Sequence, residues 1–154
     1  MQRRTFLQGT VAGSAVAVAV GAGLISPRNV LAAWPKSAFE AKSVQDALTG
    51  LFGSANTSPS GDIKIKAPDI AENGAVVPVT VSTSIKGVSD ISLIVEKNPS
   101  PLAANFKIGA NGKGFVSTRI KMGKTSNVIA VVKAGGKAYA ARKDVKVTIG
   151  GCGG

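Results

Sequence analysis

The 154-residue sequence has no histidine, one cysteine and few aromatic residues. Without histidine, the chain lacks the most common general base and the most common metal ligand of proteins. A single cysteine excludes an internal disulfide and any zinc site built from several cysteines. One Tyr and one Trp offer few rings on which bases could stack, so nucleic acid binding is not expected. We therefore expect no catalytic residue, no metal and no cofactor in this chain.

Positive charge is in excess but dispersed. The chain has 19 Lys and Arg residues against 8 Asp and Glu residues, for a formal net charge of +11. The lysines occur singly along the sequence and do not form the run of like charge that is typical of interaction tails. A diffuse positive field favours anionic small molecules or acidic protein surfaces, and ordinary solubility explains it equally well.

Residues 1–32 have the features of a cleavable export signal. The pair Arg3-Arg4 is followed by Phe6 and Leu7, and then by an apolar stretch shorter than the ~20 residues that span a bilayer. This arrangement resembles the twin-arginine signal, from which Gln2 and Gln8 depart. We expect cleavage after residue 32 or 33, which removes three arginines and leaves a charge of +8. The mature protein is then expected in the periplasm, without a membrane anchor.

Residues 34–53 are predicted to form an N-terminal helix. Ser37 and Glu40 have the spacing of a capping box, and Gly53 offers a stop. Residues 54–61 are rich in Asn, Thr, Ser, Pro and Gly and indicate a linker. The helix would pack on the domain through apolar residues at helical spacing, namely Val44, Leu48, Leu51 and Phe52.

Residues 62–149 alternate between apolar and polar residues, which predicts half-buried β-strands. Turn residues separate the strands, and Gly135-Gly136 indicates a tight hairpin. About seven short antiparallel strands without intervening helices predict an all-β fold, an immunoglobulin-like β-sandwich. Pro78 predicts that its strand lies at a sheet edge, and the long last strand predicts a bulge near residues 143–144.

One strand segment is apolar throughout. Residues 128–132 read Val-Ile-Ala-Val-Val and do not alternate. Such a segment suits a strand that is covered on both faces, and also a strand whose outer face meets another subunit. Both interpretations remain open from the sequence.

The last five residues place the only cysteine between glycines, as Gly150-Gly151-Cys152-Gly153-Gly154. Glycine has no side chain to bury, so we predict a flexible arm that carries a thiol and takes no part in packing. Fully extended, five residues reach at most ~17 Å, enough to place the sulfur in another protein's cleft. No neighbouring cation lowers the pKa of this thiol, so activation would have to come from a partner.

Other interpretations of Cys152 stay open. The cysteine could be incidental, or it could lock a periplasmic structural adaptor into a dimer through an intermolecular disulfide. The ending Gly153-Gly154 is similar to that of ubiquitin-like sulfur carriers, which are activated in the cytoplasm. The export signal argues against that third interpretation.

The terminal pentapeptide on an exported β-sandwich resembles the SoxY family, the sulfur-carrier subunits of the thiosulfate-oxidising Sox system. Two further stretches are similar to that family, residues 37–52 with Ala38-Phe39-Glu40-Ala41 and residues 98–102 leading to Phe106. The resemblance implies a non-enzymatic carrier in which Cys152 holds thiosulfate-derived sulfur as a thiosulfonate and then a persulfide. Gly150, Gly151, Gly153 and Gly154 would form the swinging arm.

The same resemblance implies partner proteins. SoxZ would form a heterodimer with this chain. SoxAX would couple thiosulfate to the cysteine, SoxB would release sulfate, and SoxCD, where present, would oxidise the remaining sulfur. Metals and haems would then belong to these partners.

Overall fold

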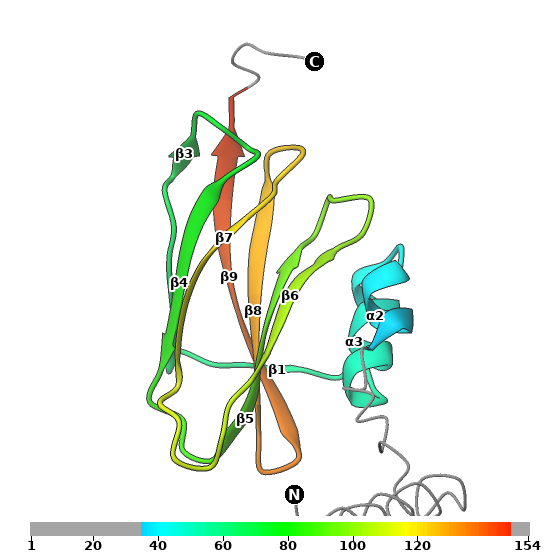
Figure 1. Ribbon diagram of the computed structural model, residues 1–154, viewed down its shortest axis with the longest axis vertical. Helices are drawn as coiled ribbons and strands as arrows, with labels where there is room; N and C mark the ends of the chain where they lie inside the picture. The colour runs from blue at the N-terminus through cyan, green and yellow to red at the C-terminus, as the bar shows by residue number, and fades with distance from the viewer. Residues whose placement is uncertain (1–34, 149–154) are drawn as a thin grey trace, which may run out of the picture. The chain divides into compact units, whose positions relative to one another are not determined.

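The structure, a computed structural model, describes residues 35–148 of the chain. In this part, two short helices precede nine strands (Figure 1). The bounds are α2 (Lys36–Glu40), α3 (Val44–Phe52), β1 (Ser58–Pro59), β2 (Ile63–Lys66), β3 (Ile70–Ala71), β4 (Val77–Thr83), β5 (Val88–Val95), β6 (Leu102–Lys107), β7 (Phe115–Ile120), β8 (Ser126–Ala134) and β9 (Lys137–Val147). The predicted export signal, residues 1–32, lies outside the described residues.

The N-terminal helical segment consists of two helices, so the prediction of a single helix over residues 34–53 is wrong. The chain breaks between α2 and α3 because Ser43 caps α3: its hydroxyl oxygen accepts a hydrogen bond from the Asp46 backbone N–H at 3.0 Å. The predicted box of Ser37 and Glu40 does not form, since α2 has no side-chain cap. Gly53, at φ 74°, ends α3 as predicted.

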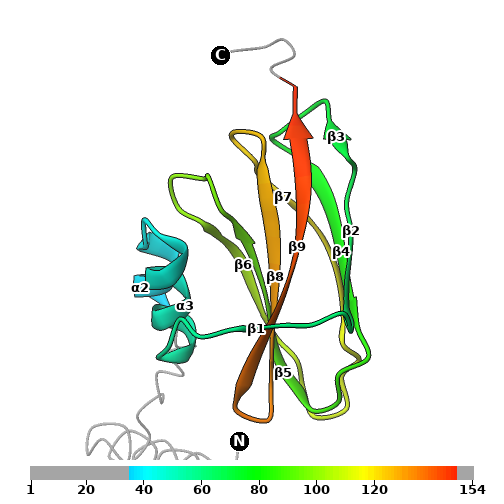
Figure 2. The same cartoon turned by 180° about the vertical axis from the view of Figure 1, so that it is seen from behind.

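Two sheets form the body of the fold. One sheet has the order β1-β9-β8-β5-β6, with β3 also on β9, and the other has the order β2-β4-β7. The seven longer strands pair antiparallel, whereas the two-residue strands β1 and β3 run parallel to β9 at different points along it (Figure 2). This order, with consecutive strands crossing between the sheets, is that of an immunoglobulin-like sandwich and confirms the predicted fold class.

Pro78 lies in β4, the middle strand of its sheet, so the prediction of an edge strand is wrong. The Thr83 backbone N–H bonds the Gly114 carbonyl, so odd-numbered residues of β4 direct their backbone groups toward β7. Pro78 therefore directs its nitrogen toward β2, whose pairing with β4 stops at Thr80. The absent N–H costs no ladder bond because β4 is a local edge at this position.

The predicted bulge in the last strand is also absent. β8 and β9 pair without a register shift from Ser126 opposite Val145 to Ala134 opposite Lys137. The irregularities lie in β5, between Val88 and Asp90 toward β8 and between Leu93 and Ile94 toward β6. The hairpin at Gly135-Gly136 forms as predicted, with both glycines at positive φ.

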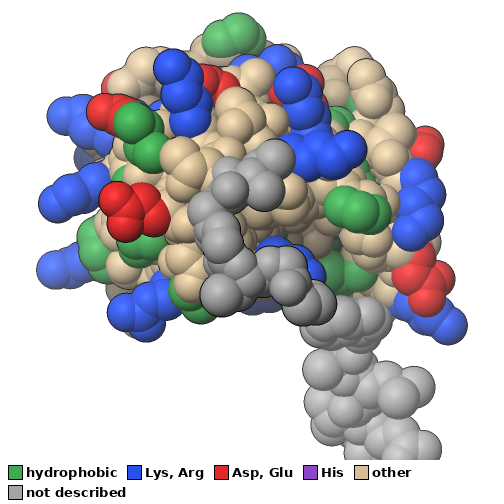
Figure 3. Space-filling model, turned by 90° about the horizontal axis from the view of Figure 1, so that it is seen from above, with side chains coloured by type: hydrophobic (Ala, Val, Ile, Leu, Met, Phe, Trp, Pro, Cys, Tyr) green, Lys and Arg blue, Asp and Glu red, His purple; other side chains and the backbone are tan. Residues whose placement is uncertain are grey.

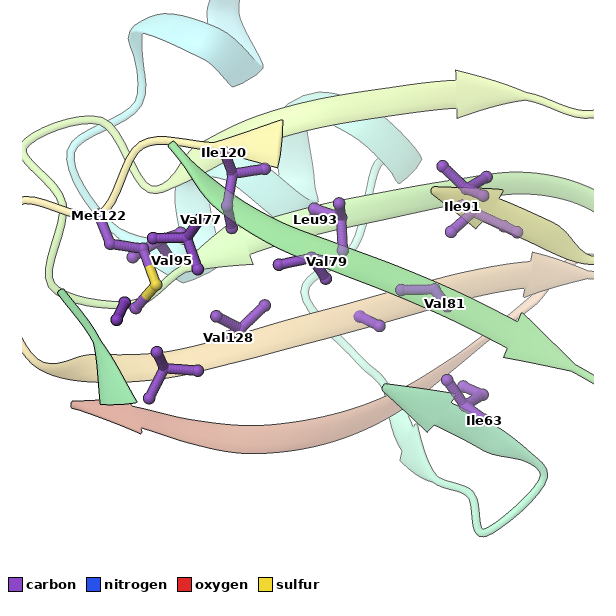
Figure 4. Packing of buried hydrophobic residues seen from close by; sticks show 14 of the residues in the cluster. Ile63, Val77, Val79, Val81, Ile91, Leu93, Val95, Ile120, Met122 and Val128 are labelled. Carbon is purple, nitrogen blue, oxygen red and sulfur yellow. The ribbon is translucent and has the colours of Figure 1, made fainter. Parts of the chain in front are cut away.

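The main core lies between the two sheets. Valines of β4 point toward residues of β5 and β8 in the facing sheet (Figure 4). Alternating residues of each strand contribute to it, as the period of two predicts. Its fully buried members include Val77, Val79, Val81, Ile91, Leu93, Val95, Val128 and Val132.

A second apolar cluster lies between the helices and the outer face of the larger sheet. Ile129 and Val131 of β8 pack there with Leu48 of α3, while Val128 and Val132 face the main core. The continuously apolar segment is therefore covered on both faces by the chain itself. The alternative interpretation, a subunit interface at residues 128–132, is wrong.

Asp90 predicts a pH dependence of stability. It is buried in β5, its Oδ1 lies 2.6 Å from Lys107 Nζ, and its Oδ2 accepts a 2.7 Å hydrogen bond from Ser89. Burial raises the pKa of this carboxyl, but the hydrogen bonds from Lys107 and Ser89 outweigh burial and hold the pKa below its usual range. A carboxyl with a lowered pKa stabilises the fold above its ordinary pKa, and this contribution is lost as the pH falls through the lowered value.

We expect the free energy of unfolding to fall less steeply in Asp90→Asn than in the unaltered protein as the pH drops below about 5. Chemical denaturation at a series of pH values measures both slopes. Equal slopes would show that Asp90 does not carry this dependence.

Candidate functional site

At one end of the sandwich, β9 finishes at Val147, and residues 149–154 follow Thr148 in the sequence. Cys152 and its four glycines lie outside the described residues, as do Arg3, Arg4, Phe6 and Leu7, so all of these site residues stay predictions. Thr148 is the last described residue, and Cys152 follows it by four positions. Four residues span at most about 14 Å, so the Cys152 Cα lies within that distance of Thr148.

The chain leaves the sandwich from a firmly held point. The Thr125 side chain makes both polar contacts with Val147: its Oγ1 accepts from the Val147 N–H at 2.9 Å and lies 3.4 Å from the Val147 carbonyl oxygen. On the other side, the Thr148 N–H donates to the Ala71 carbonyl at 3.1 Å. β9 is thus tied on both sides up to its last described residue.

Two neighbouring loops are joined to each other beside this point. Asn98, in the loop after β5, donates from Nδ2 to the Lys121 carbonyl at 2.7 Å and accepts from the Gly123 N–H at 3.0 Å. The Met122 N–H donates to the Gly74 carbonyl at 2.7 Å, which adds the turn before β4. Sequence reasoning missed Thr125 and Asn98 as anchors, although Asn98 opens the stretch 98–102, Asn-Pro-Ser-Pro-Leu, whose Asn and Pro residues are typical of turns.

Charge and apolar surface occur together at this end. Seen along the sandwich, Lys and Arg side chains stand around the rim among fewer Asp and Glu side chains (Figure 3). Lys143 Nζ donates to Asp69 Oδ1 at 2.6 Å, and this contact holds the pKa of the Asp69 carboxyl below its usual range. We call the anchored residues Val147 and Thr148 the root of the arm. Two large apolar side chains near it are exposed, Ile70 with 57% and Val76 with 51% of their surface. This end therefore offers contacts to a partner beside the predicted thiol.

Gly74→Ala tests the packing at this end. A Cβ at Gly74 would overlap the Met122 carbonyl oxygen and lie 2.9 Å from Val147 Cγ1, so the turn and β9 would have to separate. Overpacking of this kind costs about 1–3 kcal/mol of unfolding free energy. Chemical denaturation should show that loss, whereas the control Gly61→Ala, with open space around its Cβ, should stay near the unaltered protein. Equal stability of the two variants would contradict the contact.

The described residues contain no group of three or more metal-ligating side chains. Neither described helix has the length and apolar character needed to cross a bilayer. Within residues 35–148, the most distinctive feature related to the predicted chemistry is therefore the anchored root of the arm.

Comparisons with known proteins assign the chain to a family. A family model described as "Sulfur oxidation protein SoxY" matches residues 48–152, a range that includes Cys152. The solved structure of the sulfur carrier protein SoxY from Chlorobium limicola f thiosulfatophilum is 50% identical, with a TM-score of 0.63 over 70% of this chain and 97% of that one.

A chain from a structure of T cell activation by toxic shock syndrome toxin-1 matches at 9% identity and a TM-score of 0.41, over 56% of this chain and 99% of that one. None of the curated protein sequences matches. The family model and the half-identical structure agree with each other and with the β-sandwich described above. The chain belongs to the SoxY family of sulfur oxidation proteins, and it is a sulfur carrier protein rather than a catalyst.

Proposed function

We propose that this chain carries thiosulfate-derived sulfur covalently on Cys152 and presents it to the enzymes of the Sox system in the periplasm. The observation that carries this proposal is the place of the only cysteine, four residues beyond the anchored Thr148. The glycines on both sides of Cys152 add no side chains that could obstruct entry into a narrow cleft. The fixed root and the short arm limit the volume in which a partner meets the sulfur.

Loading is an oxidation. The Cys152 thiolate and the outer sulfur of thiosulfate form an S–S bond, and the two electrons released would pass one at a time to haem groups of SoxAX-type cytochromes, each haem accepting one electron. The product is a thiosulfonate on the cysteine, Cys–S–S–SO₃⁻. Because the thiolate is the nucleophile and the arm has no neighbouring cation that lowers the pKa of the thiol, the partner's site must promote its ionisation.

Release of sulfate is a hydrolysis. A SoxB-type enzyme adds water to the terminal sulfur, the S–S bond to the sulfonate breaks, and sulfate and a cysteine persulfide remain. This step needs no oxidant or reductant, because hydrolysis transfers no electrons to or from an outside acceptor. A SoxCD-type dehydrogenase, where present, would take electrons from the remaining sulfur.

We further propose SoxZ as a stable partner and export through the twin-arginine pathway. Residues 128–132 do not serve the SoxZ contact, because α2, α3 and the main core cover them. The contact must therefore use another surface of the sandwich.

Intact-mass spectrometry of protein from thiosulfate-grown cells tests the proposal. We expect masses that correspond to an added thiosulfonate and an added single sulfur, both removed by a thiol reductant. The same masses in Cys152→Ser would place the adducts elsewhere and overturn the proposal. A mass of two chains joined by a disulfide, without sulfur adducts, would favour the structural adaptor instead.

A further inference from the structure

The two sheets differ in what covers their outer faces. Helices α2 and α3 pack on the outer face of the larger sheet, whereas the described residues place no element on the outer face of the β2-β4-β7 sheet. Strand alternation identifies the side chains of this second face, since the intervening apolar residues belong to the main core. They are Lys64, Lys66, Pro78, Thr80, Ser82, Phe115, Ser117 and Arg119, and we call this set the open face.

The open face is cationic. It carries Lys64, Lys66 and Arg119, and strands β2, β4 and β7 contain no acidic residue. Among the described residues, none of these three cations forms an ion pair. Two acidic residues lie close to β2 in sequence: Asp62 precedes the strand at the end away from Thr148, and Asp69, which follows it, forms an ion pair with Lys143. The positive charge is therefore available to an external anion.

The open face also has the residue types that protein interfaces use. Phe115 has 56% of its surface exposed, and Arg119 lines a shallow hollow of about 400 Å³ with Pro78, Ser117 and Thr118. Exposed aromatic and Arg residues carry much of the energy of protein contacts. Between them, Thr80 and Ser117 hydrogen-bond each other at 2.9 Å, so the centre of the face is polar and uncharged.

We propose that the open face docks an acidic surface of the enzymes that act on the arm, and this rests on the proposed function. A second copy of this chain is a poor occupant, because like charges would meet. Three strands at ~4.8 Å spacing and seven residues at ~3.4 Å give a face on the order of 300 Å². Stable complexes bury about 800 Å² on each partner, so the contact is transient and its rate depends on charge. Such a partner can dock, act on the sulfur and leave.

The test uses thiosulfate oxidation by a periplasmic extract from cells that lack this protein, supplemented with purified protein. The variant is Lys66→Glu with Arg119→Glu. The control is Lys86→Glu with Lys137→Glu, which makes the same charge change at exposed positions. Lys86 lies between β4 and β5 and Lys137 begins β9, so both lie at the end of the sandwich opposite to the end at which β9 finishes. In dilute salt, we expect the variant's half-saturating concentration to rise about tenfold with an unchanged maximal rate, and the control to match the unaltered protein.

Salt supplies a second readout. The Debye length shortens from ~30 Å at 0.01 M to ~8 Å at 0.15 M salt, so the half-saturating concentration of the unaltered protein should rise with salt while that of the variant stays nearly constant. The proposal would be overturned if the variant had the same half-saturating concentration and the same salt dependence as the unaltered protein. Vesicles of anionic phospholipid test a membrane as the alternative occupant. The proposal would also be overturned if the unaltered protein bound these vesicles and lost its activity in their presence while the variant did not bind them, because the open face would then be a membrane-binding surface.

Competition separates this proposal from the proposed function. Cys152→Ser keeps the open face, so it should inhibit the unaltered protein, whereas Cys152→Ser with Lys66→Glu and Arg119→Glu should inhibit far less. Equal inhibition by both would overturn docking through the open face, although the carrier function would stand. Activity of Cys152→Ser by itself would instead refute the carrier function.

Discussion

Cys152→Ser is expected to reduce thiosulfate oxidation by complemented cells to the level of cells that lack the protein. The sequence contains no other cysteine, so no second thiol can take over the sulfur. A serine hydroxyl can form neither the thiosulfonate nor the persulfide that the proposed cycle needs. Thiosulfate consumption by cells that express equal amounts of each protein measures this effect.

A displaced thiol provides the matched control. The double variant Cys152→Ser with Ser84→Cys keeps one cysteine, at an exposed position after β4 and far from Thr148. It should remain inactive, because the position of the thiol on the arm matters and its mere presence does not. Activity in either variant would refute the covalent role of Cys152. The circular dichroism spectra of both should match that of the unaltered protein, since Cys152 follows the last strand.

Val131→Asp is expected to unfold the domain or bring it close to unfolding. Val131 has no exposed surface and lies beneath the helices, in the cluster with Ala38 and Leu48. An unpaired carboxylate at that position costs several kcal/mol, against a total stability of about 5–15 kcal/mol for a typical domain. Chemical denaturation, or the loss of a cooperative transition, measures this effect on the isolated chain.

Two further variants keep this prediction testable if Val131→Asp does not fold. Val131→Ala removes apolar contact without adding charge and should cost roughly 2 kcal/mol. Lys137→Asp introduces the same carboxylate at an exposed position in the adjacent strand and should change stability little. Full stability of Val131→Asp in the isolated chain would mean that the α2–α3 segment does not cover β8, and would revive the subunit-interface interpretation.

Local periodicity predicted the strands well, because a strand with one face in the core alternates between apolar and polar residues. β2, β4 and β7 show it clearly, and so does the hairpin at Gly135-Gly136, where the turn needs two residues at positive φ. The prediction of one continuous helix over residues 34–53 was wrong because the chain starts a second helix at Val44. Ser43 and Asp46 hydrogen-bond each other where α3 begins, whereas α2 begins without a side-chain cap.

Pro78 and residues 128–132 show where a sequence pattern stops being decisive. Proline lacks one backbone N–H, so it needs a position at which no neighbouring strand accepts a hydrogen bond from it. A middle strand offers such a position where the neighbouring strand is shorter, as β2 is beside Pro78. An apolar segment needs cover on both faces, but the pattern does not say which element supplies it. The helices supply it here, through contacts with residues about 80 positions away in the sequence.

By itself, the sequence determined the chemistry of this protein: one thiol, no histidine, a glycine-flanked arm and an alternating pattern that leads to a β-sandwich. These properties depend on residue types and short spacings, which a linear chain displays directly. Only the tertiary structure decided which sheet face is covered and which is open, and which side chains hold the root of the arm. Pairings between distant segments bring Thr125 beside Val147 and Asn98 beside Gly123, and they place the cations of the open face on one side of a sheet. Such pairings exist only once the sheets have formed.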